Sequence, residues 1–237
     1  MKTKKNLNIK NWKKYLFEFL SVFFAISFAF ILERWNEDRK NILAENKILN
    51  EIYNGLERDS LDLDYDEQYY KTTFDGLKYF NKIIDGHIIK TDSLVNFYYF
   101  ITRDVLVVQN KSGYESLKSK GLETIANDSL RSKIINLYEV DYDLSEKFNE
   151  QFQENKFSEN YFHKINDVIA PNFEYDSLGN IKGIKLPLII EEKQRKLLKS
   201  YFWKIAITKG ERFRTNKSQK EKIGKLRKSI KKYLDDN

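Results

Sequence analysis

The sequence predicts a mainly helical protein, with one N-terminal transmembrane helix that continues into an antiparallel helical bundle. A small hairpin is expected near residues 173–187. Only nine Gly and two Pro occur among 237 residues, too few for the many turns of a strand-rich sandwich or barrel. A long apolar run lies near the N-terminus, and hydrophobic residues recur at helical spacing through most of the remaining chain.

The apolar run extends from residue 15 to residue 32 and carries one charge, Glu18. As an α-helix it spans about 27 Å, close to the hydrocarbon thickness of a bilayer. No small-residue cleavage site lies near its exit, which favours an uncleaved signal anchor over a signal peptide or a buried core helix. Six Lys and no acid occur in residues 1–14, against four basic residues just after the run. The positive-inside rule then predicts a basic cytoplasmic tail at 1–14, in a single-pass protein of the bacterial inner (cytoplasmic) membrane with an extracytoplasmic main domain.

Small residues recur on one face of this predicted transmembrane helix. Ser21, Ala25 and Ala29 are four residues apart, and Glu18 lies on the same face. Such spacing lets membrane helices approach closely, and a polar side chain on that face can hydrogen-bond across the contact. These four residues are candidates for self-association or for docking on a partner membrane protein. The alternative is that Glu18 reaches back to the lipid headgroups and that the spacing is accidental.

Beyond the apolar run, Trp35 occupies the position of an interfacial anchor, and apolar residues then recur every seven positions. The repeat comprises Trp35, Ile42, Leu49, Leu56 and Leu63. It predicts an amphipathic stalk helix over residues 33–64, packed on its own domain rather than zipped into a strict coiled coil. Residues 65–237 are expected to form the extracytoplasmic bundle, and the first helical stripe should end at Asp85-Gly86.

Five further helices are expected along the rest of the chain. Their approximate ranges are 94–101, 114–120, 129–163, 191–208 and 217–234. Gly121 would end the second of them, and Asn127 or Asp128 would cap the third. The buried stripe of that third helix would include Leu144 and Phe152. Between the third and fourth helices, the stretch from residue 175 to 181 predicts the turn of the small hairpin.

Residue patterns typical of catalysis are missing from the sequence. It has no Cys and only two His, and no nucleotide-binding or nucleophile-elbow pattern occurs. The alternating acids Asp62, Asp64 and Asp66 are typical of a calcium loop, but Glu67 and Thr73 stand where that loop needs Gly and Glu. We therefore expect no enzyme, no cofactor and no metal ion, and interpret the three acids as part of a solvated helix face.

The charge is strongly split along the chain, although the formal net value is only +7. Residues 33–180 carry 18 basic and 28 acidic side chains, whereas residues 181–237 carry 18 basic and six acidic ones. The last helix would present a basic surface made of Lys220, Lys222, Lys225, Arg227, Lys228, Lys231 and Lys232. Three partners fit this surface: the acidic stretch 57–67 of the same chain, anionic lipid beside the anchor, or nucleic acid. Nucleic acid would require a cytoplasmic domain, which the Lys count before the run disfavours.

Three features together resemble a family of small, N-terminally membrane-anchored Gram-negative envelope proteins, which is classed as a domain of unknown function. They are Glu18 within the apolar run, Trp35-Asn36-Glu37 at its exit, and the block YESLKSKGLETIANDSLR at residues 114–131. The resemblance covers most of the chain, including the closing helix from residue 196 to 233. It implies a membrane anchor and a helical fold, and it implies no activity.

The sequence therefore predicts a non-enzymatic, single-pass interaction or assembly module of the cell envelope. It would act as a homo-oligomer or with a partner membrane protein. The alternative is an extracytoplasmic small-ligand sensor that signals through a partner membrane protein, because helical bundles can hold small molecules between their helices. Nucleic-acid binding by a cytoplasmic basic helix is the third candidate.

Overall fold

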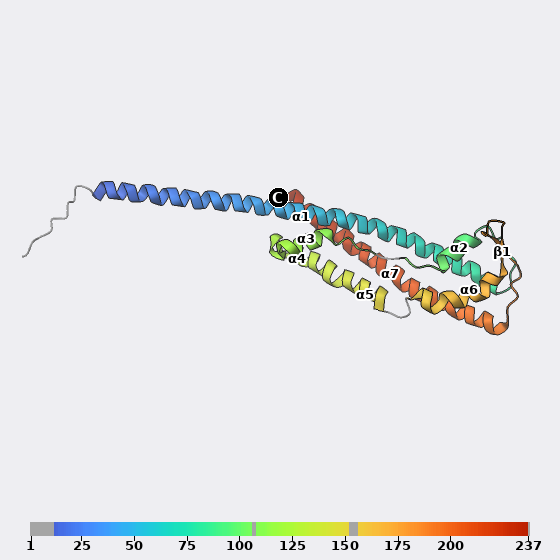
Figure 1. Ribbon diagram of the computed structural model, residues 1–237. Coiled ribbons are helices and arrows are strands. Elements are labelled where there is room, and N and C mark those ends of the chain that lie inside the picture. Colours follow the sequence, from blue (N-terminus) through green and yellow to red (C-terminus); the bar gives the residue numbers. More distant parts are fainter. Residues whose placement is uncertain (1–11, 106–107, 152–155, 237) are drawn as a thin grey trace, which may run out of the picture.

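The computed structural model describes residues 12–105, 108–151 and 156–236. In these residues the chain is mainly helical, with one two-stranded sheet. Two long helices, α1 (Trp12–Ile84) and α7 (Glu192–Asp236), run side by side in opposite directions, and the shorter elements lie along them (Figure 1). The mainly helical class, the long N-terminal helix and the small hairpin are therefore confirmed, while the predicted tail at 1–14 lies largely outside the described residues.

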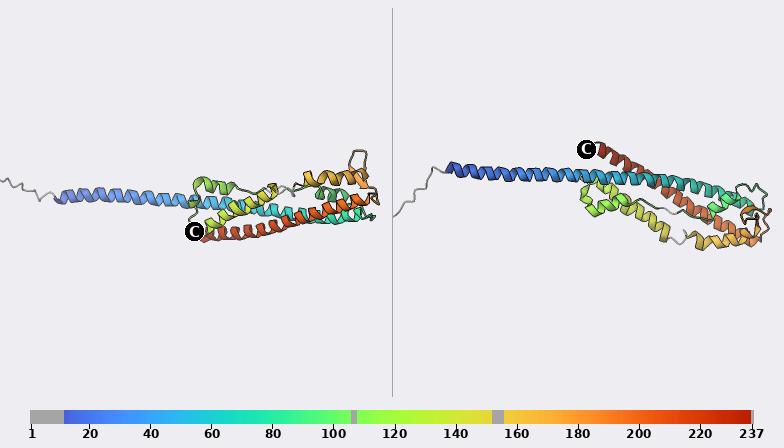
Figure 2. Two further views of the ribbon diagram at one scale, coloured as in Figure 1. Left: turned by 90° about the horizontal axis from the view of Figure 1, so that it is seen from below. Right: turned by 45° about the horizontal axis from the view of Figure 1, so that its top comes forward.

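Helix α1 is one unbroken helix of 73 residues. Its N-terminal half projects from the rest of the molecule as a lone helix (Figure 2). No residue from 12 to 44 is buried, and the first buried residue of the helix is Glu45. Trp35 and Ile42, the first two members of the seven-residue repeat, are accordingly exposed, whereas Leu49 is fully buried. The helix ends where the sequence predicts, since Gly86 follows with a φ of +85°.

Helix α7 is also continuous, so the prediction of two separate helices at 191–208 and 217–234 is wrong. The segment that joins the two predicted ranges is polar, with Lys209, Arg212 and Asn216 at its inner positions. In the structure these three side chains are buried and bind acidic partners, so the inward-facing stripe of the helix continues through them. A polar stretch can remain helical and buried when most of its polar groups find partners, and here only Arg212 Nε among the atoms of these three side chains is buried without one.

Two short helices follow α1 at the predicted places. These are α2 (Leu94–Ile101) and α3 (Ser112–Lys120). Gly113 permits α3 to lie directly against α1, because a Cβ atom there would stand 2.6 Å from the backbone nitrogen of Ile52. Gly121 ends α3 with a φ of +108°, as predicted, and the short turn η2 (Leu122–Thr124) follows.

The helix predicted at 129–163 is continuous from residue 128 to 151 but changes to π-helical geometry within that range, and further helical elements follow from residue 158. The elements are α4 (Asp128–Ile135), the π-helix η3 (Asn136–Tyr142), α5 (Asp143–Gln151), the π-helix η5 (Ser158–Phe162), α6 (His163–Ile169) and the turn η6 (Ala170–Asn172). The predicted cap is present, since Asn127 Oδ1 accepts the backbone N–H of Leu130 at 2.9 Å. A π-helix takes more residues per turn than an α-helix, so the buried face rotates along η3. Leu144 is consequently 66% exposed and Ser145 is buried, contrary to the predicted stripe, and Phe152 lies outside the described residues.

Strands β1 (Phe173–Tyr175) and β2 (Ile181–Ile184) form the antiparallel hairpin, with Phe173 opposite Ile184. The hairpin lies at the end of the molecule far from the projecting half of α1 (Figure 1). It covers the hydrophobic cluster between the end of α1 and the start of α7.

Two hydrophobic cores lie one after the other along the pair of long helices. The proximal core, nearer the projecting half, joins α1 residues 48–63 and α7 residues 223–230 to α3, α4 and η3. The distal core joins α1 residues 77–84 and α7 residues 198–205 to α2, α6 and the hairpin. Between them, and overlapping the proximal core at Asp59, is a group of buried polar side chains, here called the polar layer: Asp59, Asp66, Lys209, Arg212, Asn216 and Gln219.

Candidate functional site

The projecting half of α1 is strongly apolar and exposed to solvent in the described residues. An 18-residue window within α1 has a mean hydropathy of 2.1, and none of it is buried. Aromatic side chains are prominent there, with Phe17 73% and Phe30 66% exposed. By length and composition such a helix can cross a bilayer.

All four residues predicted to mediate membrane-helix association lie on this projecting half. Ser21 Oγ donates a hydrogen bond to the carbonyl of Phe17 at 2.8 Å, and the Glu18 carboxylate lies 4.0 Å from Lys14 Nζ. Ala25 and Ala29 are exposed, and no second helix covers them in the described part of the chain. The orientation of Glu18 toward Lys14 accords with the alternative that it reaches toward the headgroups. Association through this face remains a prediction.

Trp35, the predicted interfacial anchor, is 61% exposed at the end of the apolar run. The guanidinium of Arg39 lies 5.9 Å from the centre of its ring. An aromatic ring and a cation at the same level suit the boundary between hydrocarbon and water.

The predicted basic surface of α7 divides into two parts. Lys220 pairs with Asp64, Arg227 Nη2 lies 3.0 Å from Glu57 Oε1, and Lys222 Nζ lies 2.6 Å from Asp141 Oδ1. Of the three partners considered for this surface, the acidic stretch of the same chain therefore makes direct contacts with it. The remaining members, Lys225, Lys228, Lys231 and Lys232, lie toward the C-terminal end of the helix.

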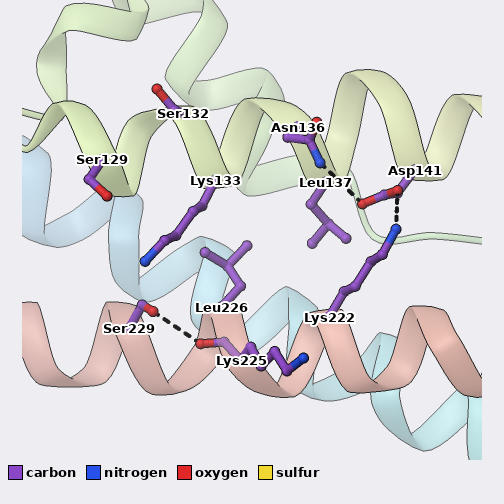
Figure 3. Close-up of a pocket in the computed structure, with 10 residues that line it drawn as sticks. All are labelled: Ser129, Ser132, Lys133, Asn136, Leu137, Asp141, Lys222, Lys225, Leu226 and Ser229. Atoms are coloured by element: carbon purple, nitrogen blue, oxygen red, sulfur yellow. Dashed lines mark hydrogen bonds and ion pairs between the residues drawn. The ribbon is translucent and has the colours of Figure 1, made fainter.

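A groove of about 850 Å³ runs between α7 and the α4–η3 segment (Figure 3). Leu137 and Leu226 extend toward each other between the two segments, and Lys222 reaches across to Asp141. Three lysines and three serines occur among the lining residues, which are Ser129, Ser132, Lys133, Asn136, Leu137, Asp141, Lys222, Lys225, Leu226 and Ser229. The groove is an open, basic hollow with an apolar centre.

Lys209 and Arg212 occupy the centre of the polar layer, where both bind Asp104. Their nitrogens lie 3.2 and 2.9 Å from Asp104 Oδ1, and Lys209 Nζ also donates to the carbonyl of Arg103 at 3.0 Å. Burial lowers the pKa of Lys209, although the adjacent Asp104 carboxylate opposes that effect. The two cations therefore share Asp104 as their direct ion-pair partner, while Arg212 also lowers the pKa of Asp66 through its charge without pairing with it.

A smaller cavity of about 270 Å³ opens beside the polar layer, and three carboxylates of α1 line it. Asp59 accepts hydrogen bonds from Tyr142 Oη at 2.5 Å and from the Asn110 backbone N–H at 2.7 Å. Asp66 accepts one from Asn216 Nδ2 at 3.0 Å, while Asp62 lies between the two and is exposed.

Burial raises the pKa of both inner carboxyl groups of this cavity. For Asp66 the pKa rises to about 6, because loss of solvation outweighs the hydrogen bond from Asn216. The negative charge of Asp62 raises the pKa of Asp59 and of Asp66 further. The cavity is thus acidic, and its charge is only partly compensated by the surrounding protein.

Two amide groups that line the same cavity are buried without a hydrogen-bond partner. They are Gln219 Oε1 and Gln109 Nε2, and the Gln219 residue is only 5% exposed. A buried polar atom without a partner is uncommon, since it forfeits hydration and gains nothing in return. The unpartnered oxygen of Gln219 marks this cavity as a candidate binding site.

Sequence reasoning did not find this site. The sequence predicts that Asp62, Asp64 and Asp66 form a solvated helix face rather than a calcium-binding loop. They do lie on a continuous helix, but Asp66 is buried. Asp64 points elsewhere and pairs with Lys220. The available signal was the spacing of Asp59, Asp62 and Asp66 at i, i+3 and i+7, which places them on one face.

In the described residues no group of three His, Cys, Asp or Glu side chains converges closely enough to hold a metal ion. Comparisons with family models, with curated proteins and with solved structures give no match to this chain. The resemblance to an envelope-protein family therefore rests on the quoted residues alone, and the function must be argued from the site itself.

Proposed function

We propose that this protein is a single-pass, membrane-anchored interaction or assembly module of the cell envelope, without catalytic activity. Residues 15–32 cross the inner membrane, and the remainder forms an antiparallel helical bundle on its extracytoplasmic side. The observation that carries the proposal is that α1 is one continuous helix with two different halves. Its apolar N-terminal half is not buried, and its C-terminal half contributes residues to both hydrophobic cores.

The free energy gained when apolar side chains move from water into a bilayer supports membrane insertion of the projecting half. Each Leu, Ile or Phe side chain that leaves water gains about 1.5–3 kcal/mol, and the run contains more than ten such residues. No part of the described chain provides that burial. A bilayer does so over a length that matches the run, and the six lysines before it favour an N-terminus in the cytoplasm.

The distance of the basic surface from the proposed membrane segment helps to decide between lipid and protein as its partner. Tyr233 Oη donates to Glu45 Oε1 at 2.9 Å, so the C-terminal end of α7 lies level with Glu45. Glu45 follows Leu32 by 13 residues, a rise of about 20 Å along the helix. Electrostatic attraction in physiological salt decays over about 8 Å. The lysines of α7 are therefore better placed to meet a protein partner than to meet lipid headgroups.

Insertion is tested by substituting Phe24→Lys together with Phe28→Lys in the full chain. Lysine at the centre of a membrane helix costs about 2.5–3.5 kcal/mol, so the fraction that resists alkaline extraction from membranes should fall sharply. The matched control is Ile42→Lys with Leu43→Lys, two exposed apolar residues of α1 outside the run, which should leave extraction unchanged. Recovery of the unsubstituted chain in the soluble fraction of lysed cells would overturn the anchor.

The location of the main domain is tested by protease treatment of a C-terminally tagged chain. The tag should be lost once the outer barrier is opened and the cytoplasmic membrane is still intact. Survival of the tag until lysis would reverse the proposed orientation and return nucleic acid to consideration for the basic surface.

Assembly through the small-residue face is tested by Ala25→Leu with Ala29→Leu, which should weaken self-association in a membrane two-hybrid reporter. Ser27→Leu adds similar bulk on a different face of the helix and should have little effect. Equal association of all three chains would remove this face from the proposal.

A second candidate function is an extracytoplasmic ligand sensor, and the acidic cavity beside the polar layer is the observation that favours it. The cavity lies between α1 and α7, so a ligand there would contact the same helix that enters the membrane. The chemistry of that ligand is developed below.

A further inference from the structure

We propose that the cavity lined by Asp59, Asp62 and Asp66 binds a small linear polyamine. This inference does not depend on membrane insertion, because the cavity lies wholly within the folded part of the molecule. It rests on the spacing of the carboxylates, on an unpartnered acceptor in the wall, and on the apolar residues between the polar groups.

The three carboxylates form a row rather than a cluster. Their Cα atoms follow one another along α1 by three and then four residues, a rise of about 4.5 and 6 Å. Carboxylates set apart in this way do not converge on one metal ion, in agreement with the absence of a metal-binding group among the described residues. A linear polyamine carries its ammonium groups at intervals of a few methylene carbons, which is a comparable repeat.

The hydrogen-bonding groups of the wall favour a ligand that donates. Gln219 Oε1 is a buried acceptor without a partner, and carboxylate oxygens accept further bonds even where they already hold one. Gln109 presents an unpartnered Nε2, and a half-turn of its amide exchanges that donor for the oxygen with little change in shape. An ammonium group, which only donates, satisfies each of these acceptors.

Two cations of α7 already have other direct ion-pair partners, although the charge of Arg212 also acts on Asp66. Lys220 pairs with Asp64, and Arg212 pairs with Asp104, so neither is the direct counter-ion of Asp62. A ligand with two or three positive charges would supply the missing compensation. It would also reduce the repulsion between Asp62 and the two buried carboxylates.

The remainder of the lining suits a methylene chain. Leu63, Val108 and Ile223 contribute apolar surface between the acidic and amide groups, together with the ring of Tyr65. A compact hydrated cation would gain nothing from these side chains, whereas the methylene spacers of a polyamine would bury apolar area against them. The cavity volume of about 270 Å³ suits a ligand of this small size.

Calorimetric titration of the purified full-length chain in non-ionic detergent with spermidine tests the proposal. At pH 8 the carboxylates are ionised and the amines are protonated, and physiological salt suppresses unspecific attraction. We expect saturable binding of one spermidine per chain, with butylamine and Mg²⁺ at least tenfold weaker. No binding of spermidine at millimolar concentration, or equal binding of Mg²⁺, would overturn the proposal.

Substitutions locate the binding in this cavity. Asp62→Asn removes an exposed charge without disturbing the core, and the loss of one charge-assisted hydrogen bond should lower the association constant about tenfold. Gln219→Leu removes the unpartnered acceptor and should also weaken binding while leaving the fold intact. The matched control is Glu67→Gln, which removes a neighbouring charge that pairs with Lys71 outside the cavity. An equal effect of Glu67→Gln and Asp62→Asn would show attraction to the general charge of the helix and refute a built site.

Discussion

At the scale of single residues, the buried carboxyl groups of Asp59 and Asp66 determine part of the pH dependence of stability. Burial raises the pKa of both, for Asp66 from 3.8 to about 6. Between these two values the folded chain holds a proton that the unfolded chain has lost. The stability that Asp66 contributes is therefore fully present below pH 3.8 and is lost as the pH rises through about 6.

Asp66→Asn should remove this dependence. The asparagine keeps an oxygen for the hydrogen bond from Asn216 but cannot ionise, so the variant should be about 1 kcal/mol more stable than the parent at pH 7.5. At pH 4, where the parent is mostly protonated, the two chains should unfold alike. Urea unfolding at both pH values measures the difference. A variant that is destabilised equally at both values would show that the ionised form is well accommodated.

The same residues explain why sequence reasoning missed the cavity. The spacing of Asp59, Asp62 and Asp66 is legible in the sequence, but whether a helix face is wet or buried depends on what packs against it. Here the covering residues are Gln109 and Gln219, which lie about 50 and 160 positions away along the chain. When a helix face is covered by polar residues from distant parts of the chain, the sequence of that helix shows no hydrophobic periodicity that would indicate its burial.

At the scale of elements, the close approach of α3 to α1 requires a residue without a side chain at position 113, where the sequence has Gly113. A Cβ atom on Gly113 would meet backbone and side-chain atoms of Ile52 at 2.6 to 2.9 Å, so the two helices would have to separate.

Gly113→Ala should therefore destabilise the protein by about 1–3 kcal/mol, as overpacking commonly does. Gly224→Ala is the matched control, because a Cβ atom there meets nothing within 4 Å and alanine favours the helix interior. That substitution should stabilise by about 0.5–1 kcal/mol. Thermal unfolding of the two variants should shift in opposite directions, and a shared direction would contradict the packing argument.

Element boundaries were predictable where local chemistry sets them. Gly86, Gly121 and Asn127 mark helix ends in the sequence and do so in the structure, because a positive φ or a side-chain cap acts within a few residues. The π-helix η3 was not predictable, since it places Tyr142 against Asp59 on another helix. The continuity of α7 was missed for the same reason, because its polar middle is held by Asp66 and Asp104 on other elements.

At the scale of the whole molecule, the division of α1 at Glu45 predicts that folding and anchoring are separable. No residue from 12 to 44 is buried, so a chain that begins at residue 40 loses no core contact in the described structure.

The fragment 40–237 should therefore be monodisperse without detergent and should unfold at the same temperature as the full chain. Size-exclusion chromatography and circular dichroism check both points. The control is the fragment 57–237, which lacks Ile48, Leu49 and Ile52 of the proximal core and should lose its cooperative transition. Aggregation of the longer fragment would mean that the projecting half contributes to the fold.

The arrangement of two cores on either side of the polar layer has a consequence for motion. Hydrophobic contacts are continuous within each core. At the polar layer, α7 is held to α1 by the Asn216–Asp66 hydrogen bond and by contacts of the Phe213 ring with Tyr70 and Phe74, and it is held to the segment after α2 by ion pairs with Asp104. The molecule should therefore open in two cooperative steps, and backbone amides of the hairpin end should exchange with solvent independently of those around Leu49. A compound that binds at the junction would slow both classes of amide together, because it would tie the two units into one.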